Sequence, residues 1–380
     1  MNFEKITEYL DSLEALGIPS VDCIISRNHE IIYRHMNGTV DFEHKKPVSK
    51  DQLYIMFSMT KIQTMTAIMQ LVEQGKISLE DEVSKYLPAY KNLLVEEKDE
   101  NGNVTVVPAK TPLKIKYLLS MQSGLDYDLE RPGIKRVLSE KGMQATTREI
   151  VDAFVETPLK FHPGTHFMYS LSHDVAAAIV EVVSQMKFSE YLKKNIWEPL
   201  GMRDTFFAKP MNNLDRVAEQ YIFMDEKKGI VPMDKSCNYQ LSECYESGGA
   251  GLISCTEDYA KLGDTLACGG TTKDGIQILK PETIDIIKTN LLCEQSLKDV
   301  VTTMGRLGYG YGCGMQILMH PELINSPAPA GVFGWDGAAG SCLIMDRSTN
   351  TSLVYTMHVR NCGMAYGVIH PRLRDFLFED

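Results

Sequence analysis

Ser58 and Lys61 are the two residues whose types and spacing could do chemistry together. They lie three positions apart in FSMTK, at the start of a helical pattern that runs from Ser58 to Gln74. One helical turn brings both side chains onto one face, within mutual reach. The positive end of the helix disfavours a lysine cation, which lowers the pKa of the amine, and it offers backbone N–H groups to an anion. The pair could therefore be a nucleophile and its base, although Ser58 could equally be only a helix N-cap.

A second copy of the same S-x-x-K spacing shows how weak the pattern is alone. It occurs at Ser184 and Lys187, after the apolar run VAAAIVEVV. That copy falls late in its predicted helix, where the backbone offers carbonyl groups instead of free N–H groups. We expect no chemistry there, and chemistry at Ser58 requires further partners.

Two other segments could supply those partners. Tyr169 follows a Pro-Gly turn and precedes a long apolar helix. An ordinary lysine, with a pKa of about 10.4, is a poor base at neutral pH. A phenol that relays the proton would help, and a neighbouring ammonium would lower the pKa of that phenol. The glycine-rich strand GVFGWDGAAGSCLIMD could bring a backbone N–H to an oxyanion, opposite the N–H of Ser58. A half-buried structural tyrosine and a tightly packed sheet are the competing interpretations.

In this order and spacing, the three segments resemble the serine β-lactamase and penicillin-binding-protein fold. The resemblance is to its class C-like branch, which includes the family VIII carboxylesterases. SMTK matches S-x-x-K, YSL falls where the family has Y-x-N, and WDG falls where it has K-T-G or H-T-G. Further similarity comes from LLSMQSGLDY, FHPGTHFMYS, ESGGAGLISCTEDYAKL and GYGYGCGM, so that the resemblance covers about Val21 to Arg360.

The resemblance implies a role for each matching residue. Ser58 would be the acylated nucleophile, Lys61 its proton acceptor, and Tyr169 the group that activates the attacking group and returns a proton to the leaving group. The backbone N–H groups of Ser58 and Ala338 would form the oxyanion hole. The implied substrate-binding positions are Trp335, Asp336, Gly337, Gln122 and Leu171. The resemblance implies neither a metal nor a cofactor.

Two departures from the family pattern bear on the substrate. Leu171 stands where the family has an asparagine, so an amide that would bind an acylamino group is missing. Trp335 stands where it has a lysine, so the cation that would hold a lactam or peptide carboxylate is missing too. W-x-G at this place is similar to the esterases of the branch. We therefore expect a carboxylesterase acting on small to medium esters.

Several other activities stay open at this stage. A β-lactamase, an amide hydrolase like a D-alanyl-D-alanine carboxypeptidase and an acyltransferase would all form the same acyl-enzyme. A non-catalytic protein that traps an acyl group fits less well, because Ser58, Lys61 and Tyr169 are all present.

Composition narrows the partners and the location. The net charge of −11 and the pI near 5.4 argue against a nucleic-acid or anionic-membrane surface, so we expect a small-molecule ester or amide as partner. The nine cysteines form no C-x-x-C pair, and the first residues lack a basic start and a long apolar stretch. These features predict a cytoplasmic protein. The oligomeric state is left open.

The elements that must position these residues predict an α/β (α+β) fold. Strand-like runs lie near both chain ends, and helical patterns fill the middle. We expect an antiparallel sheet flanked by N- and C-terminal helices, built from residues 1–95 and 305–380. A mainly helical lobe, residues 96–304, is inserted between them, with the active-site cleft between the lobes.

Overall fold

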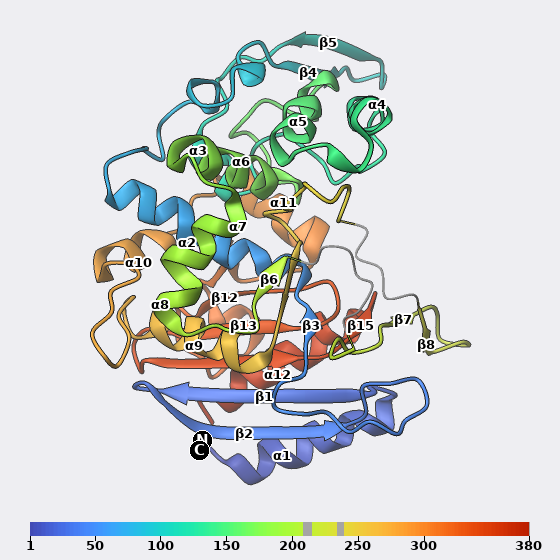
Figure 1. Ribbon diagram of the computed structural model, residues 1–380, viewed down its shortest axis with the longest axis vertical. Coiled ribbons are helices and arrows are strands. Elements are labelled where there is room, and N and C mark those ends of the chain that lie inside the picture. The colour runs from blue at the N-terminus through green and yellow to red at the C-terminus, as the bar shows by residue number, and fades with distance from the viewer. Residues whose placement is uncertain (208–214, 234–238, 380) are drawn as a thin grey trace.

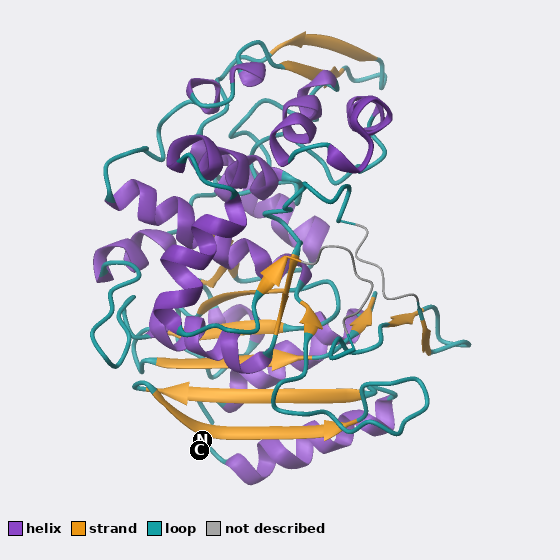
Figure 2. Ribbon diagram, in the orientation of Figure 1, coloured by secondary structure: helices purple, strands orange, loops and turns teal. Residues whose placement is uncertain are grey.

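The computed structural model describes residues 1–207, 215–233 and 239–379 of the chain. Its strands gather in the lower part of the molecule and most helices in the upper part, apart from one hairpin at the top (Figure 2). The prediction of an α/β fold with an antiparallel sheet is confirmed.

The central sheet has seven strands and is antiparallel throughout. Its order is β10 (Tyr309–Tyr311), β11 (Gln316–Leu318), β12 (Phe333–Asp336), β13 (Cys342–Asp346), β14 (Thr351–Thr356), β1 (Ser20–Arg27) and β2 (Glu30–Gly38). The predicted hairpin at Asn28 and His29 is present, and both residues have positive φ. Since β1 pairs with β14, strands from the two ends of the chain lie side by side within one sheet.

Helices cover both faces of this sheet. Cys23 and Ile25 of β1 pack in one hydrophobic cluster with α1 (Phe3–Ser12) and α12 (His370–Phe376), whereas Ile24 points into the other cluster. This alternation is the two-residue period of a strand. Helix α9 (Thr256–Ala267) contacts β1, β13 and β14 from the face of Ile24. Helix α9 lies within residues 96–304, the segment predicted as the helical lobe. The division of the chain into two lobes stays a prediction.

The remaining elements form the upper part of the molecule and the rim of the sheet (Figure 1). The helices are α3 (Ile115–Leu119), α4 (Pro132–Lys141), α5 (Thr147–Asp152), α6 (Ser172–Ser184), α7 (Phe188–Leu192), α8 (Glu198–Leu200), α10 (Pro281–Ile287) and α11 (Glu294–Met304). The small sheets are β4 (Leu94–Lys98) with β5 (Val104–Pro108); β3 (Tyr54–Ile55), β9 (Leu252–Ser254) and β6 (Phe206–Phe207); and β15 (Val359–Arg360), β7 (Tyr221–Phe223) and β8 (Ile230–Pro232). In the described part of the chain, no helix combines the length and apolar character needed to cross a bilayer.

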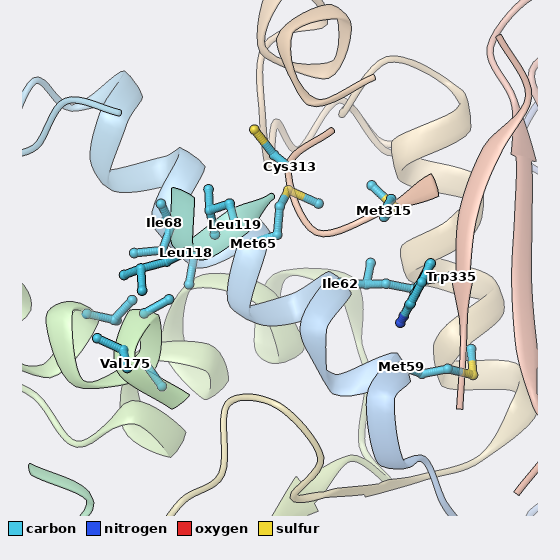
Figure 3. Packing of buried hydrophobic residues seen from close by; sticks show 14 of the residues in the cluster. Met59, Ile62, Met65, Ile68, Leu118, Leu119, Val175, Cys313, Met315 and Trp335 are labelled. Atoms are coloured by element: carbon cyan, nitrogen blue, oxygen red, sulfur yellow. The ribbon is translucent and has the colours of Figure 1, made fainter. Parts of the chain in front are cut away.

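Helix α2 (Thr60–Glu73) runs through the core and carries the candidate site at its first turn. Residues Thr60 to Leu71 are all buried, which is typical of a central helix surrounded on every side. Figure 3 shows Ile62, Met65 and Ile68 along this helix and Met59 directly before it; Met59 and Ile62 lie beside Trp335 of β12. The buried helix therefore joins the helical part to the sheet next to the candidate nucleophile.

We expect Ile62→Ala to lower the free energy of unfolding by about 2–5 kcal/mol, because it removes a fully buried side chain from this junction and leaves a cavity. Ile286→Ala, at a helical isoleucine that is 45% exposed, is the matched control and should cost less than about 1 kcal/mol. Urea unfolding followed by circular dichroism measures both. Equal losses in the two variants would contradict this account of the core.

Candidate active site

The backbone before Ser58 is held in a strained turn. β3 ends at Ile55, a 3-10 turn covers Phe57–Met59, and α2 begins directly after it. Phe57 has a φ of 45°, which is unusual for a bulky residue. Its ring is fully buried, lies edge-to-face against Tyr239 and has the Arg360 guanidinium 5.2 Å from its centroid. These contacts hold the strained conformation, which places Ser58 at the positive end of the helix.

The amine of Lys61 is held by three oxygen atoms. Lys61 Nζ donates to Ser58 Oγ at 3.1 Å, to Tyr127 Oη at 3.0 Å and to the Gly249 carbonyl at 2.7 Å. The side chain is completely buried, so the amine is fixed beside the hydroxyl without contact with solvent. A base within hydrogen-bond distance of a serine hydroxyl is the arrangement that nucleophilic catalysis requires.

Burial sets the protonation of this amine. It lowers the pKa of Lys61 to about 7, and the carboxylates of Asp174 and Asp336 offset part of that effect. An ammonium loses more solvation energy on burial than a neutral amine does, which explains the direction. Lys61 therefore has a substantial neutral fraction near pH 7, where an ordinary lysine has almost none.

Tyr169 lies next to the same amine and the same hydroxyl. Its ring centroid is 4.7 Å from Lys61 Nζ, and its phenol lies close enough to the Ser58 hydroxyl for that hydroxyl to affect the pKa of the phenol. The expectation that Lys61 lowers the pKa of this phenol is wrong. Burial raises that pKa, and the hydrogen bonds to Ser58 and Trp335 offset only part of the rise. At neutral pH Tyr169 is a protonated phenol that can donate.

Trp335, one of the implied substrate-binding residues, also contacts the phenol of the site. The indole Nε1–H donates to Tyr169 Oη at 3.1 Å. The residue is only 2% exposed, and its ring lies edge-to-face against Tyr311 at 4.9 Å and beside Met59 and Ile62 (Figure 3). The tryptophan that replaces the family lysine thus still offers an N–H, but to the phenol.

Strand β12 approaches the start of α2 closely. A Cβ on Gly337 would lie 2.4 Å from the Met56 carbonyl oxygen, so a glycine is needed at this contact. β11 pairs with Phe333 and Gly334 only, so among the described residues no strand pairs with β12 on that side from Trp335 onward. Ala338 follows just beyond the strand and lines the same pocket as Ser58.

The pocket at this place has a volume of about 300 Å³. It is lined by Ser58, Tyr169, Thr303, Met304, Arg306, Trp335, Asp336, Ala338 and Tyr366. Five of the residues predicted for the site, Ser58, Tyr169, Trp335, Asp336 and Ala338, line it directly, and Lys61 lies behind Ser58.

Gln122 and Leu171 are not brought to this pocket, contrary to the expectation for both. Gln122 is buried, and its amide donates to Ser120 Oγ and the Leu291 carbonyl and accepts from Ser296. Leu171 is 1% exposed and packs in the core just before α6. Ser184 and Lys187 of the second S-x-x-K lie at the end of α6 and just before α7, away from the pocket.

Three residues of the site were missed from the sequence. Tyr127 and Gly249 hold the amine of Lys61, and a Cβ on Gly249 would lie 2.6 Å from Asp174 Oδ2. Both lie in segments that carry the family resemblance, SGLDY and ESGGAGL, which was the only available indication. Arg306 lines the pocket just after α11, and no motif marks it.

Residues 5–364 match the family model described as Beta-lactamase. The chain belongs to the Beta-lactamase family. It is 26% identical to esterase EstB of Burkholderia gladioli over 93% of this chain and 89% of that protein. It is 25% identical to a putative D-alanyl-D-alanine carboxypeptidase of Escherichia coli K12, over 88% and 79% of the two chains. The solved structure of EstCE1, described as a hydrolase with promiscuous acyltransferase activity, has the same fold: the TM-score is 0.78, with 24% identity over 99% of this chain and 98% of that one.

The pKa of Lys61 predicts how the reactivity of Ser58 depends on pH. The amine accepts a proton only when neutral, so the rate of Ser58 labelling by a fluorophosphonate should rise through about pH 7 and level off above it. Tyr127→Phe removes an acceptor that stabilises the ammonium, which should move the midpoint down by about 0.5–1 pH unit. The labelling rate is measured at each pH by quenching the reaction at set times and determining the labelled fraction from the intact mass.

Tyr90→Phe is the matched control for that series. Tyr90 is another buried tyrosine, but its hydroxyl donates to the Val151 carbonyl and does not touch Lys61. Its midpoint should equal that of the wild type. A wild-type rate that falls as pH rises through 7 would contradict the assignment of Lys61 as the base.

Proposed function

We propose that this serine hydrolase of the Beta-lactamase family is a carboxylesterase that forms an acyl-enzyme at Ser58. The observation that carries the proposal is the 3.1 Å contact between the Ser58 hydroxyl and a buried lysine amine whose pKa is lowered to about 7. A nucleophile and a base matched to neutral pH meet here at the edge of a pocket.

In the proposed mechanism, neutral Lys61 takes the proton of Ser58 as Oγ attacks the ester carbonyl carbon. The backbone N–H groups of Ser58 and Ala338 stabilise the oxyanion. Tyr169 then donates its proton to the departing alkoxide, the C–O bond breaks and an alcohol leaves. The Lys61 ammonium passes the proton that it took from Ser58 to the Tyr169 phenolate, so that the amine is again a neutral base and the phenol is again an acid. A water molecule, losing its proton to the regenerated base, attacks the acyl ester, and Ser58 recovers a proton as the carboxylic acid departs.

The pocket supports an ester substrate with an apolar portion. Met304, Trp335, Ala338 and Tyr366 contribute apolar surface around the hydroxyl of Ser58. No asparagine stands at position 171 and no lysine at position 335, so two groups that recognise acylamino and carboxylate substituents in the family are absent. The relation to esterase EstB supports the same choice.

Acyl transfer to an alcohol or amine is the second candidate, because the acyl-enzyme is common to both reactions. The description of EstCE1 as a hydrolase with promiscuous acyltransferase activity supports this second candidate. Amide hydrolysis has the support of the carboxypeptidase relative. A fluorophosphonate probe followed by intact mass separates these enzymes from an acyl-trapping protein, since a trap would be labelled without turning over esters.

We place this activity in the cytoplasm, on a small-molecule substrate. The eight cysteines among the described residues are free thiols, which suits a reducing compartment. The net charge of −11 supports neither nucleic acid nor an anionic membrane as partner.

The ester preference can be tested with two chromogenic substrates. We expect p-nitrophenyl butyrate to be cleaved with a kcat/KM at least about a hundredfold above that for a cephalosporin, because the groups that would hold the cephalosporin substituents are absent. Ser58→Ala should abolish both activities. Similar kcat/KM values for the ester and the cephalosporin would refute the substrate part of the proposal.

The indole hydrogen bond to Tyr169 predicts a loss in kcat. Trp335→Phe keeps an aromatic side chain but removes the N–H donor, so kcat for p-nitrophenyl butyrate should fall about five- to tenfold with little change in KM. Trp197→Phe is the matched control: its indole is also buried and donates to Gln63, away from the pocket, and kcat should stay unchanged. A change confined to KM would show that Trp335 serves only as a wall.

A further inference from the structure

An ion pair lines the pocket beside the candidate nucleophile. Arg306 Nη2 donates to Asp336 Oδ2 at 2.5 Å, and each side chain is only 11% exposed. Both residues line the pocket that contains Ser58 and Tyr169. Arg306 comes from the loop after α11, whereas Asp336 ends β12, so the pair joins two walls of the pocket.

The charges of this pair are balanced within the pair. His370 Nδ1 is 3.9 Å from Asp336 Oδ2, but its Nε2 hydrogen-bonds with the Gly340 carbonyl and burial lowers its pKa, so the ring is neutral near pH 7. Arg374, which lines a small cavity behind β12 with Arg306, is engaged by Asp375 at 2.7 Å. One guanidinium therefore faces one carboxylate from the side of the sheet, and Lys61, whose ammonium Asp336 stabilises, is the other charged group coupled to the pair.

The guanidinium still has donors to offer. An arginine carries five N–H groups, and Asp336 is the one side chain among the described residues that accepts from Arg306. Its neighbours in the pocket, Met304 and Trp335, are largely apolar, and the hydroxyl of Thr303 is turned back onto the Asp299 carbonyl. A ligand oxygen beside Arg306 would thus meet its N–H donors between Met304 and Trp335, where the hydroxyl of Thr303 does not compete.

We propose that the Arg306–Asp336 pair selects the substrate, favouring uncharged esters that carry a second oxygen acceptor over esters that carry a carboxylate. This inference rests on the proposed esterase function and names its substrate class. The N–H groups of Arg306 bind a neutral carbonyl or ether oxygen. Asp336 compensates the charge of Arg306 and repels a carboxylate. The pocket therefore offers the N–H donors of a cation but does not prefer anionic substrates, as an unpaired arginine would.

Three p-nitrophenyl esters of similar length test the proposal on the acyl side: the hexanoate, the methyl succinate diester and the hydrogen succinate monoester. For the wild type, we expect kcat/KM for the methyl succinate to exceed that for the hexanoate about tenfold, after division by the rates of hydroxide hydrolysis. The hydrogen succinate should be the poorest of the three. A corresponding set of butyrate esters of n-butanol, methyl glycolate and glycolic acid, followed in a pH-stat, places the second oxygen on the alcohol side instead.

Two variants separate the roles of the pair. Arg306→Gln should bring the ratio of methyl succinate to hexanoate close to one. Asp336→Asn keeps a side-chain oxygen that accepts from Arg306 but leaves the positive charge of Arg306 uncompensated. The ratio of kcat/KM for the hydrogen succinate to that for the methyl succinate should therefore rise at least about tenfold. The matched control is Asp22→Asn, which removes another buried carboxylate that binds an arginine, Arg34 at 2.9 Å across strands β1 and β2, while Arg34 keeps its second partner Glu257. It should leave every ratio unchanged, whatever it does to stability.

The outcomes distinguish this inference from the function on which it rests. Ser58-dependent hydrolysis with the same ratios in wild type, Arg306→Gln and Asp336→Asn overturns the selecting role and leaves the esterase proposal intact. A wild-type preference for the hydrogen succinate, or for glycolic acid on the alcohol side, shows a carboxylate site and also overturns it. Absence of Ser58-dependent hydrolysis of every ester overturns both. If Asp336→Asn does not fold, the ratio lost in Arg306→Gln decides alone.

Discussion

The removal of one amine from water is the constraint on which the site depends. Lys61 can act on Ser58 near neutral pH only because burial makes its charged form costly. The fold must then supply oxygens for the amine in place of solvent, and it does so with a tyrosine and a backbone carbonyl from two distant segments. Gly249 is needed because its carbonyl must come this close while Asp174 lies on its other side.

The same burial acts on the neighbouring phenol in the opposite sense. It raises the pKa of Tyr169 while it lowers that of Lys61, because a phenolate and an ammonium are the charged forms of the two groups. Burial therefore favours the neutral form of both groups, so that the amine can accept a proton and the phenol can donate one at a similar pH. The indole of Trp335 fixes the phenol from the strand side.

The sequence was sufficient where a local rule connects residues to structure. The hairpin at Asn28 and His29, the helix after Ser58 and the strand that carries Trp335 follow from turn chemistry and periodicity. The family resemblance brought Tyr169 to Ser58 and Lys61 although it lies far from them along the chain. The resemblance failed where tertiary contacts decide the direction of a side chain: Gln122 and Leu171 occupy family positions but are buried in the core. The place of Arg306 in the pocket could not be predicted, because no motif tells where a loop brings its side chains. The direction of the pKa shift of Tyr169 could not be predicted either, because it depends on how deeply the phenol is buried.

The pairing of β1 with β14 has a consequence for how the chain comes to fold during synthesis. Cys23 of β1 pairs with Tyr355 of β14. The two strands can therefore pair only after more than three hundred intervening residues have left the ribosome. Until then strands β1 and β2 form a hairpin in which the edge of β1 is unpaired, so that this edge is exposed to chaperones and to other nascent chains. The helices of the middle segment are made during this interval, and the last strands to emerge bring Trp335 and Ala338 to a nucleophile synthesised long before them.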